Sequence, residues 1–270
     1  MCATFVASWS GVVRFHGVRP QPMRGQVPGV FVSNHSSMID FIILEHADMY
    51  AVLGQQHKGW VAWWQNSILN SIDCIWFDRG SKEKRHETAE RIKNHATDPD
   101  KVPLLVFPEG TCVNNEYVLQ FKQFVFTLGV PINPVAIRYN KIFVDGYWNS
   151  RQQSFHGHLF SLMTSWAVVC DVHFLPPMAI RAGEEPSAFA ARVQRRIAHK
   201  IGLKAMPWDG YMKYWAPSER FMQARRAAIA EDMLAVHGMG EPALLKEERE
   251  KAEGSGDDRE NEGEGEEGGV

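Results

Sequence analysis

Short runs of apolar residues recur along the chain as far as Phe174, and longer segments with helical spacing of apolar and polar positions lie between several of them. The short runs predict buried β-strands, and the longer segments predict α-helices. The expected strands are 30–33, 50–53, 74–77, 104–107, 133–138 and 168–174, and the expected helices are 36–45, 58–72, 81–95, 186–201 and 217–236. Their alternation predicts an α/β fold in which helices flank a sheet.

Three segments differ from this pattern. Residues 1–13 are uncharged and mostly apolar but too few to span a membrane, so they indicate either the end of a longer membrane segment in a truncated chain or an anchor at the membrane interface. Residues 152–170 are uncharged yet contain many polar positions, which indicates a semi-buried or membrane-surface segment. Residues 241–270 are rich in Glu and Gly, and their composition predicts disorder. We therefore expect a membrane-proximal segment over 1–28, a folded domain over 29–240 and a disordered acidic tail over 241–270.

The formal net charge of −3 is distributed unevenly. The tail carries twelve acidic and four basic side chains, so the rest of the chain is net basic. A mildly basic domain suits an anionic substrate or an anionic membrane surface, and the absence of a nucleic-acid-binding motif argues against nucleic acid. The four cysteines form no CxxC pair, and no cluster has the spacing of metal ligands, so we expect no metal site.

The first candidate for chemistry runs from Asn34 to Asp40, between an expected strand and an expected helix. Open α/β sheets place their sites at such positions. His35 and Asp40 are five positions apart and would point in different directions inside one helix. If His35 lies in the turn before the helix, the two side chains can meet, and an imidazole held in this way is a positioned general base. The alternative is a helix-capping loop with a surface histidine.

The second candidate is Phe-Pro-Glu-Gly-Thr at 107–111, directly after an expected strand. Gly110 permits a ligand to approach the backbone closely, and Glu109 offers an acceptor for hydroxyl groups. The alternative is a Pro/Gly turn with a solvated glutamate.

Two cations are candidates for binding a phosphate group. Arg79 follows the expected strand 74–77, and its planar guanidinium matches the geometry of a phosphate. Lys122 lies beyond the Phe-Pro-Glu-Gly-Thr block and offers a second charge. Taken singly, a surface ion pair for the arginine and a solvated side chain for the lysine are the commoner situations. Pro131 and Pro134 belong to an apolar stretch that by itself indicates only a core or edge strand.

These five blocks occur in one order, and together they resemble the glycerophospholipid acyltransferase superfamily with its NHxxxxD, FxxR-like, FPEGT and proline-led blocks. Five longer sequence segments resemble the endoplasmic-reticulum type of eukaryotic glycerol-3-phosphate acyltransferase. They are FPEGTCVNN from Phe107, PVAIRY from Pro134, YWNS from Tyr147, MTSWA from Met163 and LPPM from Leu175. The resemblance covers about residues 27–234 and implies the mixed sheet of a glycerolipid acyltransferase-like fold.

The resemblance also implies a role for each candidate residue. His35 would remove the proton of a glycerol hydroxyl, and Asp40 would orient the imidazole. The acceptor's phosphate would be held by Arg79 and Lys122, and the acceptor pocket would be lined by Glu109, Gly110 and Thr111. The acyl-donor side would be shaped by Pro131 and Pro134. One expected charge is missing, because Gln123 follows Lys122 where the family often has a second lysine, so Arg138 is a further candidate for the phosphate.

We therefore expect transfer of an acyl chain from acyl-CoA to the sn-1 hydroxyl of glycerol-3-phosphate, which forms lysophosphatidate. Histidine suits this role because its ordinary pKa of about 6.5 leaves it mostly neutral near pH 7, and a place at a helix N-terminus would favour the neutral form further. The lack of a GxSxG motif favours direct attack without an acyl-enzyme. No cofactor is expected beyond acyl-CoA as co-substrate.

Three alternatives remain. A lysophospholipid acyltransferase, acting for example on lysophosphatidate, would use the same chemistry on a larger acceptor. A non-catalytic acyltransferase-like protein would bind lipid without turnover, and a hydrolase using the same His and Asp would need a nucleophile that the sequence does not supply. The resemblance further implies a place at the endoplasmic reticulum membrane with the active site on its cytosolic face.

Overall fold

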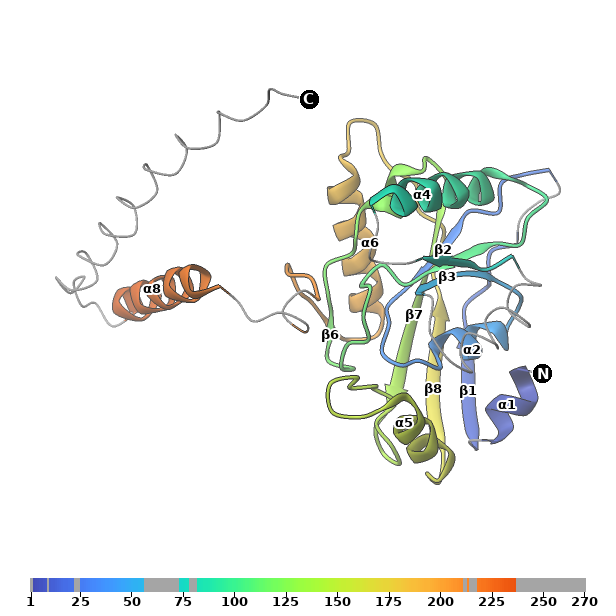
Figure 1. The fold of residues 1–270 in the computed structure, drawn as a ribbon, viewed down its shortest axis with the longest axis horizontal. Helices are drawn as coiled ribbons and strands as arrows, with labels where there is room; N and C mark the ends of the chain where they lie inside the picture. The colour runs from blue at the N-terminus through green and yellow to red at the C-terminus, as the bar shows by residue number, and fades with distance from the viewer. Residues whose placement is uncertain are drawn as a thin grey trace, which may run out of the picture. The chain divides into compact units, whose positions relative to one another are not determined.

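The computed structural model describes residues 2–8, 10–21, 25–55, 73–77, 82–210, 213 and 218–236. Its main feature is a seven-stranded sheet with the order β1-β8-β7-β2-β5-β3-β4 (Figure 1). These strands are β1 (Gly11–His16), β2 (Val30–Ser33), β3 (Ala51–Gln55), β4 (Ile75–Phe77), β5 (Leu104–Val106), β7 (Ile132–Asn140) and β8 (Val168–Phe174). A small parallel sheet pairs β6 (Tyr117–Val118) with β9 (Lys204–Ala205).

The main sheet is mixed. β2 pairs in parallel with β5 and β7, and β3 pairs in parallel with β5 and β4. β8 runs antiparallel to β7, and β1 runs parallel to β8. The predicted α/β fold with a mixed sheet flanked by helices is therefore confirmed, and the parallel strands β2 and β7 end at the same edge of the sheet.

Helices cover both faces of this sheet. On one face, α4 (Lys82–Thr97), α6 (Pro186–Lys200) and the 3-10 helix η2 (Phe124–Thr127) contribute to an apolar core that includes Val30 and Val32 of β2. On the other face, α1 (Cys2–Ser8), α2 (Asp40–Glu45) and α5 (Phe155–Met163) contribute to a core that includes Phe31. Successive strand residues point to opposite faces, so a continuous apolar run is what a strand between two cores requires.

All six strands expected from the apolar runs are present, and α4 and α6 correspond to the helices expected over 81–95 and 186–201. The helix expected over 36–45 begins only at Asp40, because the Asp40 carboxylate accepts hydrogen bonds from the Ser36 and Ser37 amides and stabilises a turn there. The helix expected over 58–72 lies outside the described residues.

Regular elements of the fold occur in or next to two segments for which the sequence left alternatives open, residues 1–13 as a membrane segment's end or an interfacial anchor and residues 152–170 as semi-buried or membrane-surface. Residues 11–16 form β1 at the edge of the main sheet, in register with β8 from Gly11 opposite Val168 to His16 opposite His173. Within 152–170, α5 begins after the Ser154 cap, and β8 begins at Val168. Sequence periodicity missed β1 because most of its residues are exposed.

Residues 211–270 form a unit separate from residues 1–210, and their described part contains α8 (Glu219–Val236). The predicted disordered tail over 241–270 lies outside the described residues. Within the described ranges, the helices are all too short or too polar to cross a membrane.

Candidate active site

The loop after β2 is fixed to the neighbouring strand by one side chain. The Asn34 amide donates to the Ile137 carbonyl at 2.9 Å, and its oxygen accepts from the Ile137 amide at 2.8 Å. Asn34 is buried, so these two bonds take the place of strand pairing just past the last residue of β2. They place His35 at the carboxyl edge of the sheet, next to β7.

His35 and Asp40 meet across the turn that precedes α2. The His35 Nδ1 atom lies 2.8 Å from Asp40 Oδ2, and the same oxygen accepts from the Ser36 and Ser37 amides at 2.7 and 2.9 Å. The Asp40 side chain is fully buried, whereas that of His35 is 21 % exposed. A buried carboxylate bonded to Nδ1 selects the tautomer whose Nε2 accepts a proton.

Tyr139 of β7 completes the environment of this carboxylate. Its hydroxyl donates to Asp40 Oδ1 at 2.5 Å, and the ring is buried. Burial and the Asp40 charge raise the pKa of Tyr139, so its phenol stays protonated and remains a donor. Asp40 thus receives hydrogen bonds on both of its oxygens.

The other side of the His35 ring contacts the block that starts at Phe107. The Phe107 ring stacks on it with centroids 4.4 Å apart, and the Cys112 Sγ atom lies 3.4 Å from His35 Nε2. With Nδ1 directed at Asp40, Nε2 is the nitrogen that shares a hydrogen bond with the Cys112 sulfur. The thiol therefore lies at the nitrogen that a base would present to a hydroxyl.

These surroundings also determine the charge of the imidazole. Burial opposes its charged form, but the Cys112 sulfur and the Asp40 carboxylate outweigh burial and raise the pKa of His35 well above its usual value. The sequence expected a helix N-terminus to favour the neutral form, but α2 begins at Asp40, five positions after His35, and the nearby Asp40 carboxylate favours the charged form.

Glu109 connects two loops of the site from a buried position. One carboxylate oxygen accepts from the His35 amide at 2.8 Å, and the other accepts from the Leu119 amide at 2.9 Å. Burial raises the pKa of Glu109 to about 8, and the two amide bonds act against this rise. Both oxygens are engaged with backbone amides in the described structure, which makes Glu109 a positioning residue for the His35 loop.

Gly110 and Lys122 lie together beside Glu109. Gly110 has a φ of +67°, and a Cβ atom there would lie 3.2 Å from the Lys122 Cε and Nζ atoms. The Lys122 amide donates to the Pro108 carbonyl at 3.0 Å, which holds this segment against the Phe-Pro-Glu-Gly-Thr turn. Thr111 is buried, and its methyl group packs against Gly210.

Other candidates from the sequence lie elsewhere. Arg79 is outside the described residues. Pro131 precedes β7, and its carbonyl accepts from the Val30 amide at the amino end of β2, away from the edge where His35 lies. Pro134 is buried inside β7. The Arg138 guanidinium donates to the Ile201 carbonyl just after α6, so it projects from the face of β7 opposite to Tyr139.

Sequence reasoning did not single out Tyr139, Phe107 or Cys112 as functional residues. Phe107 and Cys112 flank the Phe-Pro-Glu-Gly-Thr block, and Tyr139 ends the block that begins at Pro134. Their roles depend on β7 lying beside β2, which neighbouring positions in the sequence do not reveal. No three His, Cys, Asp or Glu side chains in the described part of the chain are arranged to hold a metal ion.

Comparison with known proteins identifies the class. Residues 12–138 match the family model described as Acyltransferase. The fold is similar to that of the 1-acyl-sn-glycerophosphate (LPA) acyltransferase from Thermotoga maritima, with a TM-score of 0.52 and 19 % sequence identity over 74 % of this chain and 75 % of that chain. The chain belongs to the acyltransferase family.

Within this family, the chain is similar to vertebrate proteins named glycerol-3-phosphate acyltransferase 3 or 4. It is 39 % identical over 243 residues to glycerol-3-phosphate acyltransferase 3 of Rattus norvegicus, which covers 90 % of this chain and 52 % of that protein. To glycerol-3-phosphate acyltransferase 3 of Homo sapiens it is 42 % identical over 212 residues, which are 78 % of this chain and 48 % of that protein. To glycerol-3-phosphate acyltransferase 4 of Bos taurus it is 37 % identical over 232 residues, which are 86 % of this chain and 50 % of that protein. The chain spans about half the length of these relatives.

Proposed function

We propose that this protein transfers a fatty acyl chain from acyl-CoA to the sn-1 hydroxyl of glycerol-3-phosphate and so forms lysophosphatidate. The observation that carries the proposal is the His35–Asp40 pair, in which a fully buried carboxylate holds Nδ1 and leaves Nε2 as the proton acceptor. The similarity to proteins named glycerol-3-phosphate acyltransferase over most of this chain supports the choice of acceptor.

In the proposed reaction, His35 acts as the general base. An alcohol is a weak nucleophile until its proton leaves, and a positioned base contributes about 10²–10⁴-fold to the rate. His35 Nε2 takes the hydroxyl proton as the oxygen attacks the thioester carbonyl, and Asp40 stabilises the imidazolium that forms. The C–S bond then breaks, and His35 returns the proton to the CoA thiolate. Acyl-CoA is the co-substrate, and the chemistry needs no further cofactor.

Lys122 is the cation that we propose for the acceptor's phosphate. It lies beside Gly110 and within the segment that packs on the Phe-Pro-Glu-Gly-Thr turn. An ammonium group serves phosphates as a compact point charge. Arg79 would supply a second charge from outside the described residues.

We further propose that the protein works at a membrane surface, on the cytosolic face of the endoplasmic reticulum. Both acyl-CoA and lysophosphatidate are amphiphiles, so the site must exchange them with a lipid phase. α5 and the turn after it expose Phe160, Met163 and Trp166 by 69, 48 and 89 %. The Ser37 hydroxyl lies 3.4 Å from His158 Nε2 of the same helix, so this apolar surface adjoins the His35 loop.

The direct test is thiol release from palmitoyl-CoA by the purified chain, with glycerol-3-phosphate, lysophosphatidate or no acceptor. We expect release that depends on glycerol-3-phosphate and a product acylated at sn-1 by mass spectrometry. Dependence on lysophosphatidate would instead identify a lysophospholipid acyltransferase. Binding of acyl-CoA without release in either case would identify a non-catalytic lipid-binding protein.

A second test separates direct attack from an acyl-enzyme. The thiol of Cys112 lies at His35 Nε2, which is where a nucleophilic cysteine would lie. For direct attack, Cys112→Ala keeps glycerol-3-phosphate-dependent release, with a loss well below the roughly 10²-fold or more that accompanies removal of a catalytic group. Complete loss in this variant, together with a thioester on Cys112 in the parent chain, would overturn direct attack.

A further inference from the structure

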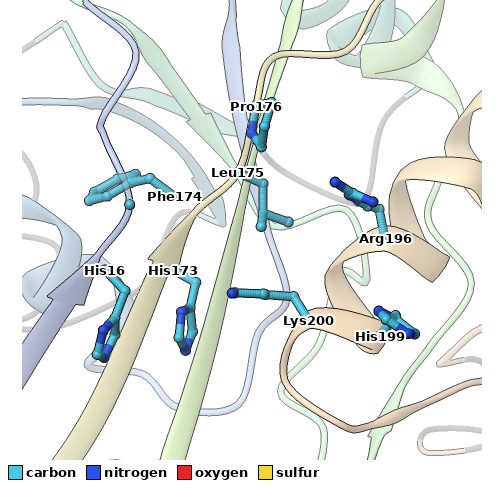
Figure 2. A pocket seen from close by; sticks show the side chains of 9 residues that line it. His16, His173, Phe174, Leu175, Pro176, Arg196, His199 and Lys200 are labelled. Carbon is cyan, nitrogen blue, oxygen red and sulfur yellow. The ribbon is translucent and has the colours of Figure 1, made fainter.

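A second concave region lies on the face of the sheet that α6 covers. Its first part is a hollow of about 310 Å³ between the ends of β1 and β8 and the last turns of α6 (Figure 2). It shares His16, His173 and Lys200 with a neighbouring hollow of about 740 Å³ that extends along β7 past Arg138. Arg138 and Tyr139 are successive residues of β7, with the Arg138 guanidinium at Ile201 and the Tyr139 hydroxyl at Asp40 on the other face. Tyr139 also borders the larger hollow, whereas the lining of the smaller hollow includes no residue of the His35 site.

The first hollow is lined by basic groups without a carboxylate. Its basic side chains are those of Arg196, Lys200, His16, His173 and His199. The nearest carboxylate of the adjoining hollow is Asp171, which already pairs with Arg14 at 2.5 Å and His16 at 2.8 Å. Within the described part of the chain, no ion pair is formed by Arg196 or Lys200. Figure 2 shows Lys200 extending from α6 toward His173.

Two histidines form one wall of this hollow and carry an unused polar atom. The His16 and His173 rings stack with centroids 4.4 Å apart. The His173 Nδ1 atom is buried and makes no hydrogen bond with the described residues. Burial is the main cause that lowers the pKa of His173, and the neighbouring His16 and Lys200 add to this effect while Asp171 opposes it.

We propose that this hollow is a binding site for the phosphate group of an anionic ligand. Like charges repel each other, and a bound anion would offset that repulsion for Arg196 and Lys200, since Asp171 is already paired with Arg14 and His16. A phosphate accepts several charge-assisted hydrogen bonds at once, and the Arg196 and Lys200 side chains that line the hollow are donors of this kind. The larger adjoining hollow leaves room for the rest of a phosphorylated molecule. The site stands on the opposite face from the proposed acyl-transfer chemistry and does not depend on it.

The test compares two double variants of the full chain that remove the same charge. Arg196→Ala with Lys200→Ala empties the hollow of its permanent cations. Arg195→Ala with Lys204→Ala removes two other exposed basic side chains, one from the same helix and one from β9. Binding of pyrophosphate is measured by calorimetry. We expect the first double variant to weaken binding by about tenfold or more and the second to leave it nearly unchanged.

Two further arms identify the source of the phosphate and exclude the acceptor site. Flotation with phosphatidylcholine vesicles, with and without phosphatidate, shows whether a lipid headgroup also binds. Flotation that requires phosphatidate and is lost in the Arg196→Ala, Lys200→Ala variant supports a lipid phosphate. Binding of pyrophosphate without flotation supports a soluble phosphate compound. Lys122→Ala should leave pyrophosphate binding nearly unchanged if the ligand binds in this hollow. Equal weakening by both double variants, loss confined to Lys122→Ala, or no binding of either probe would overturn the proposal.

Discussion

Asp40 has no solvent exposure, and each of its oxygens accepts hydrogen bonds from protein groups. A buried carboxylate is costly unless it is satisfied in this way. The amides of Ser36 and Ser37 and the hydroxyl of Tyr139 supply that compensation, so the carboxylate can stay in place to hold His35. At the residue scale, the proposed base therefore depends on groups that the NHxxxxD motif does not name.

Tyr139→Phe tests this dependence. Removing the hydroxyl leaves Asp40 Oδ1 without its donor, so we expect kcat to fall by about tenfold. KM for glycerol-3-phosphate should stay nearly unchanged, because Tyr139 is buried and acts on His35 through Asp40. The less stabilised carboxylate also raises the pKa of His35 further, so the acid limb of the pH profile should move to higher pH. A variant with a lower kcat but an unmoved pH profile would indicate a merely structural role.

The pH dependence of the parent chain provides a separate prediction. The pKa of His35 lies well above the ordinary value near 6.5, and the base must be neutral to accept a proton. Activity should therefore be lost as pH falls through that raised pKa, with the midpoint of the acid limb of kcat above about pH 6.5. Profiles of kcat at saturating acceptor remove the contribution of the acceptor phosphate's own titration. A midpoint at or below 6.5 would contradict this electrostatic account.

At the element scale, the site exists because β2 and β7 end side by side. Asn34 extends their pairing by bonding both polar groups of the Ile137 backbone. Glu109 then joins the His35 amide to the Leu119 amide. The loops that carry the chemistry are thus bound to two strands of the core, which fixes the imidazole without support from a long helix.

Asn34→Ala should show what this clamp contributes. It leaves a buried donor and acceptor of Ile137 unpaired, so we expect the free energy of unfolding to fall by about 1–3 kcal/mol and activity to fall with it. Asn94→Ala, at an exposed position in α4, is the matched control and should change stability by less than about 0.5 kcal/mol. Chemical denaturation measures both. Equal stability of the two variants would contradict the clamp.

Among the strands that sequence analysis located, β2 is buried along its whole length. Val30, Phe31 and Val32 form an uninterrupted apolar run because two cores require it, and that signal is local. β1 gave no such signal, since its outer positions include Arg14 and His16 and it relies on β8 for pairing. The two-residue strands β6 and β9 are too short to produce any period.

The candidate site divides in the same way. The contact of His35 with Asp40 follows from residues five positions apart and could be anticipated. The engagement of both Glu109 oxygens by backbone amides could not, because one partner lies 74 positions away and the other 10. Tyr139 is 99 positions from Asp40 and becomes its partner only through the sheet order.

On the scale of the whole molecule, the mixed sheet separates two polar regions. The His35 site lies at the edge shared by β2 and β7, on the face that carries α2 and α5. The basic hollow lies on the face covered by α6. β7 contributes to both, with Tyr139 on one side and Arg138 on the other. This arrangement would keep the proposed reaction site and the proposed anion site on opposite faces of one sheet.

The measurement that tests the central claim most directly is glycerol-3-phosphate-dependent release of CoA by His35→Gln. His86→Gln, at an exposed position of α4, serves as the matched control, and circular dichroism establishes that both variants keep the fold. The account predicts a loss of about 10²–10⁴-fold for His35→Gln and unchanged turnover for His86→Gln. Retention of turnover in a folded His35→Gln chain would contradict the assignment of His35 as the base.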